Sequence, residues 1–362
     1  LKPAFLLLTL AAVWFAIRAT STATRPVAHY IGEGVLTGLL IAFLLVAFEI
    51  LTRQLITRSL FTAFPSLYAN ITKHITLAAD GSVQSVTIAN LNRRMAVLIW
   101  FLWPAIMLAI HDPSRVRRLL AYASISFGAA TILLYGSHQS SQVALLGGLV
   151  AFGIASWFNR TAVIGALAAL WSAAVLLVVP ISLMTLNADL HKANWLFYSA
   201  QHRVVIWGTA AEEVMRAPII GIGADATRSA MKKAVSEAKA AEQARDFGKF
   251  DSGYANHAHN VYLQVWYELG AVGALLLLAV GLFVLKAIAT LQAGVQPTAI
   301  AMFVTTSLLI GFSYSIWQTW FIAACGLSVA IFAVAIRKRS DQLGLTGEPI
   351  PSTADKMAAK TV

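Results

Sequence analysis

The sequence predicts an all-α fold, a polytopic bundle of transmembrane helices. Two observations carry this prediction. Of the 362 residues, 58% are hydrophobic and 12% are charged, whereas an ordinary soluble domain has roughly 25% charged residues. Apolar runs long enough to span a bilayer also recur along the chain, without the ten-residue segments of alternating polarity that are typical of membrane β-barrels. A soluble globule is therefore excluded.

Each apolar run predicts one span, because a helix needs about 20 mostly apolar residues to cross a bilayer. A weaker first run near 4–17 is ended by Arg18 and Arg25. Eight further runs lie at 34–51, 95–111, 118–136, 141–157, 161–183, 260–288, 298–317 and 319–336. We expect about nine spans in this chain, followed by a polar, disordered tail over about 340–362.

Charge and cysteine content narrow the function. Cys325 is the only cysteine and lies in the last run, so no intramolecular disulfide can form and redox chemistry is not expected. No Cys/His cluster predicts a metal site and no Walker-type phosphate loop is found, so we expect no cofactor. The net charge of +11 is interpreted by its side of the membrane, where lipid headgroups and phosphates, not nucleic acid, are the nearer partners.

Short basic loops predict the orientation, because Lys and Arg of such loops stay cytoplasmic. Three clusters fit one side: Arg115, Arg117 and Arg118; Arg160; and Arg337, Lys338 and Arg339. Threading the chain through them places the C-terminus inside and residue 1 outside. An outside start at Leu1, without Met or a signal sequence, predicts that an odd number of N-terminal helices is missing. Three missing helices would give twelve.

Two segments are then expected to face away from the cytoplasm. The first, 52–94, has five cations against the single acid Asp80, namely Arg53, Arg58, Lys73, Arg93 and Arg94. This breaks the positive-inside expectation, either because the basic side chains snorkel to outer-leaflet headgroups or because they form a cationic cradle for a phosphate-bearing substrate. The second, 184–258, is too long for a simple connector and has amphipathic patterns at 199–217 and 227–247. Long ordered loops usually carry function.

The segment His257-Ala258-His259-Asn260 precedes the apolar run that contains Glu268, Gly270 and Gly273. It places a His and an Asn at the mouth of a transmembrane helix, where water meets hydrocarbon. Polar residues at this position more often cap the helix than catalyse a reaction. His257 and His259 could also bind a metal as a pair, but no third ligand is in view.

Arg203 lies in the amphipathic pattern of the long loop, ahead of Pro218, Gly221 and Gly223. An arginine there is most simply a solvated charge. The proline and the two glycines predict a helix stop and a tight turn that lets backbones approach closely.

Together these pieces resemble the signature of the O-antigen ligase and O-antigen polymerase superfamily. The resemblance covers most of the chain. Asn92-Arg93 at the head of a helix resembles a further family element, and the loop 184–258 resembles the family's periplasmic loop. The residues of the main signature are Arg203, Trp207, Pro218, Gly221, Gly223, His259, Asn260, Gly270 and Gly273.

The resemblance implies a GT-C-type membrane glycosyltransferase with about twelve helices. The reaction would transfer an O-antigen chain from undecaprenyl diphosphate to the lipid A core oligosaccharide, at the periplasmic face of the bacterial inner membrane. We expect His259 to be the general base, Arg203 and Arg93 to bind the diphosphate, and Asn260 to orient the base or the acceptor. Direct attack would invert the anomeric centre, and no metal is needed.

The sequence departs from the family at one point. Relatives often carry an arginine after Ser or Thr at the outer start of a middle helix, where this chain has Ser140-Ser141-Gln142. If that arginine binds phosphate in relatives, another cation, such as Arg93 or Lys73, must serve here.

Three other functions stay open at this stage. An O-antigen polymerase or a protein-glycosylating relative would use the same donor with another acceptor. A lipid or glycan flippase is the alternative from another class, because Glu49, Gln142 and Glu268 lie in apolar runs. A structural scaffold would leave the basic segment unexplained.

Overall fold

A computed structural model describes residues 25–68, 75–230, 247, 250 and 258–342 of the chain. The predicted first span near 4–17, Lys73, His257, most of the predicted helix at 227–247 and the tail beyond 342 lie outside the described residues.

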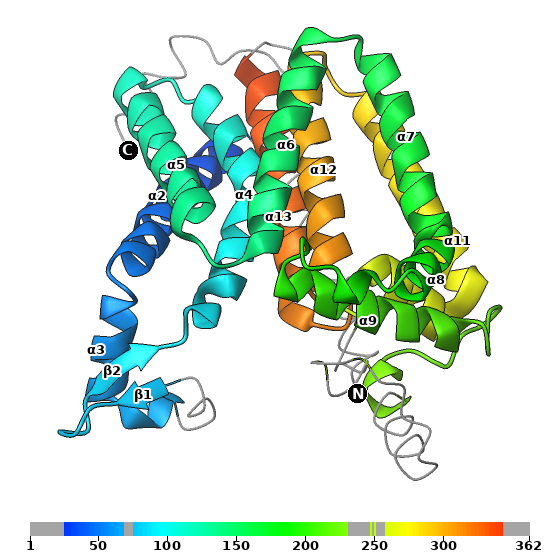
Figure 1. Cartoon of the computed structure of the whole chain (residues 1–362). Helices are drawn as coiled ribbons and strands as arrows, with labels where there is room; N and C mark the ends of the chain where they lie inside the picture. The colour runs from blue at the N-terminus through cyan, green and yellow to red at the C-terminus, as the bar shows by residue number, and fades with distance from the viewer. Residues whose placement is uncertain (1–24, 69–74, 231–246, 248–249, 251–257, 343–362) are drawn as a thin grey trace, which may run out of the picture.

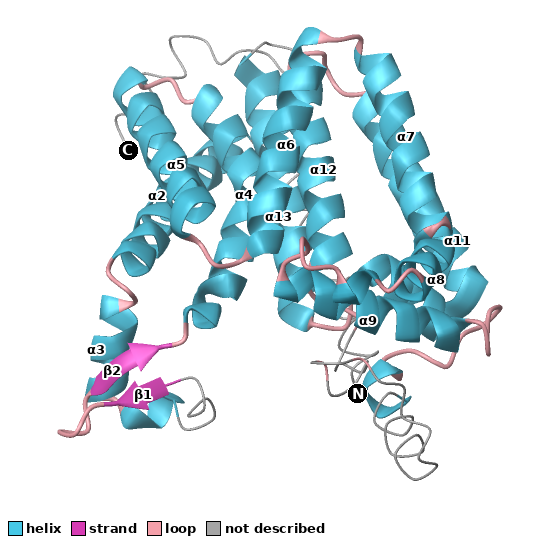
Figure 2. Ribbon diagram, viewed as in Figure 1, coloured by secondary structure: helices cyan, strands magenta, loops and turns pink. Residues whose placement is uncertain are grey.

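The described residues form an all-α bundle, as predicted (Figure 2). Six helices are long and apolar enough to cross a membrane, or seven if a bent pair counts as one span. The chain is therefore a polytopic membrane protein. The bundle helices are α2 (Arg25–Leu51), α4 (Asn92–Ile110), α5 (Arg115–Tyr135), α6 (Gln139–Trp157), α7 (Arg160–Leu176), α8 (Val178–Asn187), α11 (Val261–Ala289), the shorter α12 (Gln296–Phe312) and α13 (Thr319–Gln342).

Helix α4 is the centre of the bundle, where it packs against α2, α5, α12 and α13. Trp100 and Trp103 are fully buried on it, and each indole donates to a threonine of α12, Thr306 and Thr305 at 3.1 and 2.8 Å. Helix α6 approaches the same face of α12 closely, because a Cβ at Gly148 would lie 2.2 Å from the Thr305 hydroxyl oxygen. The core thus combines small residues with buried indoles whose N–H groups are paired.

The predicted run at 161–183 is two helices, α7 and α8, which meet at an angle of 60°. The cause is local: the ring of Pro180 would clash with the carbonyl of Leu176, four residues earlier, if the helix continued. The bend turns α8 across the end of the bundle, where it packs against α9 (Tyr198–Val214). Helix α9 confirms the amphipathic helix predicted at 199–217.

Helix α11 is also interrupted, at Gly270, whose φ of 61° and ψ of −157° are not helical. The break removes the helical bonds that Ala271 and Val272 would donate to Tyr267 and Glu268. The turn at 218–223 replaces them. Ala271 N donates to Pro218 O (2.8 Å) and Val272 N to Ile219 O (3.2 Å), while the amides of residues 222 and 223 donate to the carbonyls of 267 and 268 at 3.1 and 2.9 Å.

Glycine is required on both sides of this contact. A Cβ at Gly270 would lie 2.3 Å from Ile219 O, and one at Gly221 would lie 2.4 Å from the carbonyl carbon of Glu268. Both glycines also have positive φ. The predicted tight turn is therefore confirmed, and its purpose is to let residues 218–223 enter the broken helix.

The segment between α2 and α4 is a small folded module at one end of the bundle (Figure 1). It contains α3 (Leu55–Ala63), the 3-10 turns η1 (Pro65–Tyr68) and η3 (Ile88–Leu91), and an antiparallel hairpin of β1 (Ile75–Leu77) and β2 (Val83–Val86) that pairs Ile75 with Val86. Buried Glu49 accepts hydrogen bonds from the Ile56 and Thr57 amides at the start of α3. Gln54 ties the module together by donating to Val86 O at 2.9 Å.

The three basic clusters lie at one end of the bundle, which we call the basic end, and this agrees with the single side that the sequence predicts (Figure 1). Lys338 and Arg339 are close enough to His111 to influence it electrostatically. The starts of α4 and α9 and the α12–α13 connection lie at the opposite end, called here the site end. Which end faces the cytoplasm stays a prediction.

Candidate functional site at the site end

Two of the predicted site residues, Arg203 and His259, meet at residues 312–318, which comprise the last residue of α12 and the connection to α13. The carbonyl of Phe312 accepts from the Arg203 guanidinium at 3.2 Å and from the Ser140 hydroxyl at 2.8 Å. The next carbonyl, of Ser313, lies 2.8 Å from His259 Nδ1. The structure thus brings Arg203 of α9 and His259 of the α11 entrance onto two consecutive peptide groups, although 55 residues separate them in the sequence.

His259 is held in a defined orientation. It is half-buried and adopts a left-handed backbone conformation, φ 53°, immediately before the first turn of α11. A carbonyl oxygen can only accept, so the contact with Ser313 requires a proton on Nδ1. The neutral imidazole then carries its lone pair on Nε2. This tautomer is the one that a general base acting through Nε2 needs.

Arg203 is half-buried on α9, and burial lowers the pKa of its guanidinium, which remains charged. Two of its nitrogens donate to the carbonyls of Ser199 and Phe312. The buried Nε has no hydrogen-bond partner among the described residues, and neither does the buried hydroxyl of Ser313. A buried polar group without a partner costs about 1–3 kcal/mol, more when charged, so these two atoms indicate a place for a polar ligand.

An aromatic row links Arg203 to Arg93. His138 at the start of α6 contacts Ser141 through Nδ1 at 2.7 Å, and its ring lies 5.6 Å from that of Tyr314. Tyr314 packs edge to face on Trp320 at 4.7 Å, and the exposed Arg93 guanidinium lies 4.8 Å above the Trp320 ring. Arg93 therefore borders the first turn of α13, next to the 312–318 segment, through a cation–π contact.

Burial and the nearby Arg203 lower the pKa of His138 to about 4. The same two causes, burial first, lower the pKa of His202. Burial also raises the pKa of Tyr314 to about 12. The lowered pKa values of His138 and His202 favour their uncharged forms at neutral pH, so these two imidazoles add no positive charge beside Arg203.

Asn260 has a structural task. It is 5% exposed and caps α11, accepting from the Leu263 amide at 3.1 Å. The capping interpretation of this residue is confirmed, and its predicted role as an orienter stays a prediction. Trp207 of α9 fixes the same entrance by donating to the carbonyl of Ala258 at 2.8 Å. No group of three or more His, Cys, Asp or Glu side chains suited to a metal occurs among the described residues.

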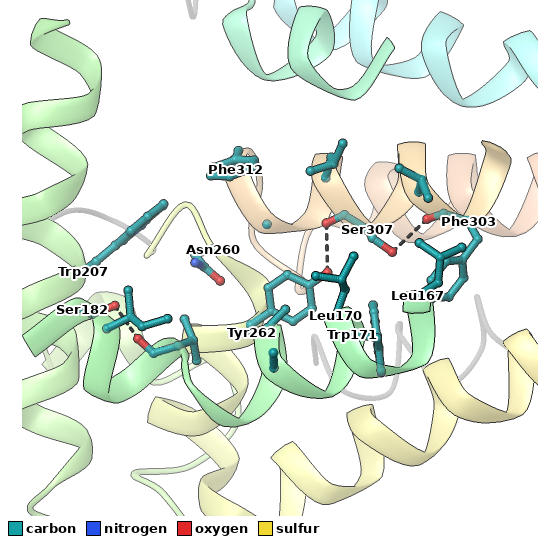
Figure 3. Close-up of a pocket in the computed structure, with 17 residues that line it drawn as sticks. Leu167, Leu170, Trp171, Ser182, Trp207, Asn260, Tyr262, Phe303, Ser307 and Phe312 are labelled. Atoms are coloured by element: carbon teal, nitrogen blue, oxygen red, sulfur yellow. Dashed lines mark hydrogen bonds between the residues drawn. The ribbon is translucent and has the colours of Figure 1, made fainter. Parts of the chain in front are cut away.

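An apolar cavity of about 390 Å³ adjoins the site between α7, α8 and α12 (Figure 3). Its polar lining is confined to Ser182, Asn260, Tyr262, Ser307 and two indoles, and the rest is aliphatic or phenyl. Trp207 and Phe312, whose rings lie 6.0 Å apart, line it beside Asn260. Because the Phe312 carbonyl binds Arg203, the cavity and the polar cluster share a wall.

Several residues of the site were not predicted from the sequence. His138, Tyr314 and Trp320 were not singled out, because each lies in a different predicted loop or helix and none belongs to a recognised pattern. One signal was available: the run Ser313-Tyr314-Ser315-Ile316-Trp317-Gln318 interrupts two apolar runs with polar and aromatic residues. At a predicted helix junction facing the same side as His259, such a run indicates a site.

Fold and site together define a class, a polytopic membrane protein with a histidine and guanidinium groups gathered at one end of its bundle. Residues 121–278 match the family described as O-antigen ligase. The matched region includes α9, Arg203, His259 and the break at Gly270, and the match supports the resemblance to the O-antigen ligase superfamily that the sequence motif predicts.

Similar proteins are known in Rickettsia, all named as candidate polysaccharide ligases. The R. conorii protein is 30% identical over 127 residues, which is 35% of this chain and 29% of that protein. The R. bellii protein is 25% identical over 240 residues, 65% of this chain and 55% of that protein. The R. felis protein is 28% identical over 127 residues, 35% of this chain and 30% of that protein. The chain thus matches between about a third and about half of the length of these relatives.

Proposed function

We propose that this protein is an O-antigen ligase that transfers a glycan from undecaprenyl diphosphate to a hydroxyl of the lipid A core oligosaccharide. The observation that carries the proposal is the convergence of Arg203 and His259 on the consecutive carbonyls of Phe312 and Ser313. A fixed cation and an oriented base at one end of a membrane bundle match the two needs of glycan transfer from a diphosphate. The superfamily match supports the reaction class.

The acceptor hydroxyl attacks the anomeric carbon while the bond to the diphosphate oxygen breaks. His259 Nε2 takes the hydroxyl proton, and the leaving diphosphate gains negative charge. Arg203 stabilises that charge with its fixed donors, including the Nε–H that lacks a described partner, and Arg93 does so from the Trp320 side. A single displacement inverts the anomeric centre. The arginines take the role of a metal ion.

The apolar cavity supports a lipid-linked donor. Its aliphatic and aromatic walls suit a hydrocarbon chain, and its end at Trp207 and Phe312 borders the polar cluster. A polyprenyl chain lying in it would bring its diphosphate toward Arg203. The proposed arrangement would suit the GT-C type of membrane glycosyltransferase that the family resemblance implies.

A flippase is less well supported. Buried Glu49 and Glu268 and half-buried Gln142, the polar residues that kept transport open, all bond within the protein. Gln142 donates to three carbonyls at the end of α5, Glu49 accepts from the start of α3, and Glu268 accepts from residues 225 and 227. These contacts stabilise helix ends and loops, whereas His259, Arg203 and Arg93 gather at one end of the bundle.

One assay tests the proposal. Purified protein is mixed with an undecaprenyl-diphosphate glycan and lipid A core, with EDTA and without nucleotide. We expect glycan linked to lipid A core. Lengthening of the donor in the absence of lipid A core would instead identify a polymerase, and loss of transfer in EDTA would overturn the metal-independent mechanism.

Labelling tests the proposed location, the periplasmic face of the inner membrane. In a Cys325→Ala background, an impermeant thiol reagent applied to cells with a permeabilised outer membrane should label Ser229→Cys, an exposed helical position at the site end. Thr161→Cys at the basic end should react only after the inner membrane is opened. The opposite pattern would place the site in the cytoplasm.

A further inference from the structure

Glu268 is the most deeply embedded carboxylate near the site, only 1% exposed. Its two oxygens accept from the Asp225 amide (3.1 Å), the Thr227 amide (3.2 Å), the Thr227 hydroxyl, the Gln264 side-chain amide (3.1 Å) and the Trp317 indole. Every one of these partners is a donor. An acceptor-only carboxylate therefore fits this position better than any neutral side chain of similar size.

These donors come from three different parts of the chain. Asp225 and Thr227 belong to the segment that follows the turn at 218–223, Gln264 to the first half of α11, and Trp317 to the α12–α13 connection. Gln264 forms a second link between the first half of α11 and the α12–α13 connection, because it also donates to the Ser315 hydroxyl at 2.9 Å. Glu268 and Gln264 thus fasten the far end of the 312–318 segment, whose near end binds Arg203 and His259.

The contacts of Glu268 and Gln264 matter because α11 is broken at Gly270. The half of α11 that follows His259 is separated from the membrane half by residues 218–223, so helix continuity does not fix its direction. The orientation of the first half depends on its lateral contacts instead. Glu268 lies two residues before the break and makes those contacts with both neighbouring segments.

We propose that Glu268 is a positioning residue for the transfer reaction: by holding residues 225–227 and 315–317 against the first half of α11, it sets the alignment of His259 with Arg203. This inference rests on the proposed function, since it assumes that these two groups act on one substrate. Glu268 does not touch the substrate. It acts through the segment that carries the Phe312 and Ser313 carbonyls.

The test compares two buried carboxylates in the purified protein. Glu268→Gln keeps the size but turns an NH₂ group toward donors. Glu49→Gln is the matched control, because Glu49 is 4% exposed and accepts from two backbone amides and a threonine hydroxyl, but lies near the end of α2, where it contacts the module between α2 and α4. We expect kcat to fall about 10–100-fold in Glu268→Gln, because misplacement of reacting groups by about 1 Å can cost 10²-fold.

The Michaelis constant for the donor lipid should change less than about twofold, and Glu268→Asp should recover part of kcat because it keeps an acceptor-only group. Glu49→Gln should lower the thermal midpoint in detergent and keep kcat per folded molecule. Trp317→Phe, which removes one donor, should lower kcat severalfold. Normal kcat in a less stable Glu268→Gln protein would overturn the inference and leave Glu268 a structural residue.

The His259→Ala variant separates this inference from the proposed function. Lost transfer in His259→Ala with normal kcat in Glu268→Gln contradicts only the positioning role. Normal transfer in His259→Ala contradicts the base mechanism itself, and the positioning role with it.

Discussion

The two ends of the bundle are both rich in arginine, but they use it differently. At the basic end, Arg117 forms ion pairs with Glu33 at 2.7 Å and Asp112 at 3.1 Å, and Arg118 donates to the Asp112 carbonyl at 2.6 Å. At the site end, Arg203 binds only backbone carbonyls in the described part of the protein, and Arg93 lies over an indole. Glu33 and Asp112 thus neutralise positive charge at the basic end. No acidic side chain of the described residues forms an ion pair with Arg203 or Arg93.

We propose that this difference separates charges that serve the fold from charges that serve a ligand. An arginine paired with carboxylates has its bidentate donors satisfied, whereas Arg203 keeps a buried Nε–H without a described partner. Net charge and the count of arginines do not distinguish the ends. Arg94 at the site end also pairs with a carboxylate, that of Glu49 at 3.5 Å. What sets Arg203 and Arg93 apart is the chemistry of their partners, and the following changes test whether that distinction has functional consequences.

The largest effect is expected from His259→Ala. Loss of a general base typically costs 10²–10⁴-fold in turnover, and donor binding should persist because arginines hold the diphosphate. Transfer rate and donor-lipid binding are measured on the same preparation. His111→Ala, at the basic end, is the matched histidine control and should stay within about twofold of the original protein. Equal losses of turnover in His259→Ala and His111→Ala would show that the two ends do not differ in function.

Arg203→Lys should lower turnover by on the order of 10²-fold although the charge is kept, because an ammonium cannot reproduce the planar donor geometry of guanidinium. Arg117→Lys at the basic end should have little effect on turnover, because its partners bind any cation. The two variants are compared by the rate of glycan transfer per folded molecule. Near-normal turnover of a well-folded Arg203→Lys protein would reduce Arg203 to a structural residue.

Acid should destabilise the site end through His138. Its folded-state pKa of about 4 lies below the ordinary 6.5, so the unfolded chain binds the proton first and stability is lost as the pH falls from about 6.5 to 4. The loss is at most on the order of 3 kcal/mol. In His138→Asn the pH dependence of the free energy of unfolding should shrink. It should not vanish, because burial and Arg339 also lower the pKa of His111 to about 4.

Gly270→Ala should destabilise the protein by on the order of 2 kcal/mol, because the backbone conformation is strained for any residue with a Cβ and the added atom would meet Ile219 O. Gly153→Ala in α6 is the control. Its Cβ would enter open space, so alanine should be neutral or slightly stabilising. Thermal unfolding in detergent compares the two. Equal midpoints would mean that the break in α11 is not maintained by Gly270.

The bundle itself could be predicted from sequence, since apolar runs of bilayer length have few other stable conformations in lipid. The helices at 92–110, 115–135 and 139–157 follow their predicted runs within a few residues. The breaks were harder to predict. Pro180 lay inside a run that was long enough for one span, and Gly270 inside another, and hydropathy alone does not reveal where a helix bends.

His259, Arg203 and Arg93 could be selected from sequence because motif spacing and charge placement are properties of the chain. Only the tertiary structure showed that the 312–318 segment joins Arg203 to His259, that Asn260 is engaged as a cap, and that Glu268 holds the other end of the same segment. The physical reason is that hydropathy and spacing are local, whereas a hydrogen bond from α9 or α11 to the α12–α13 connection depends on how the helices pack against one another.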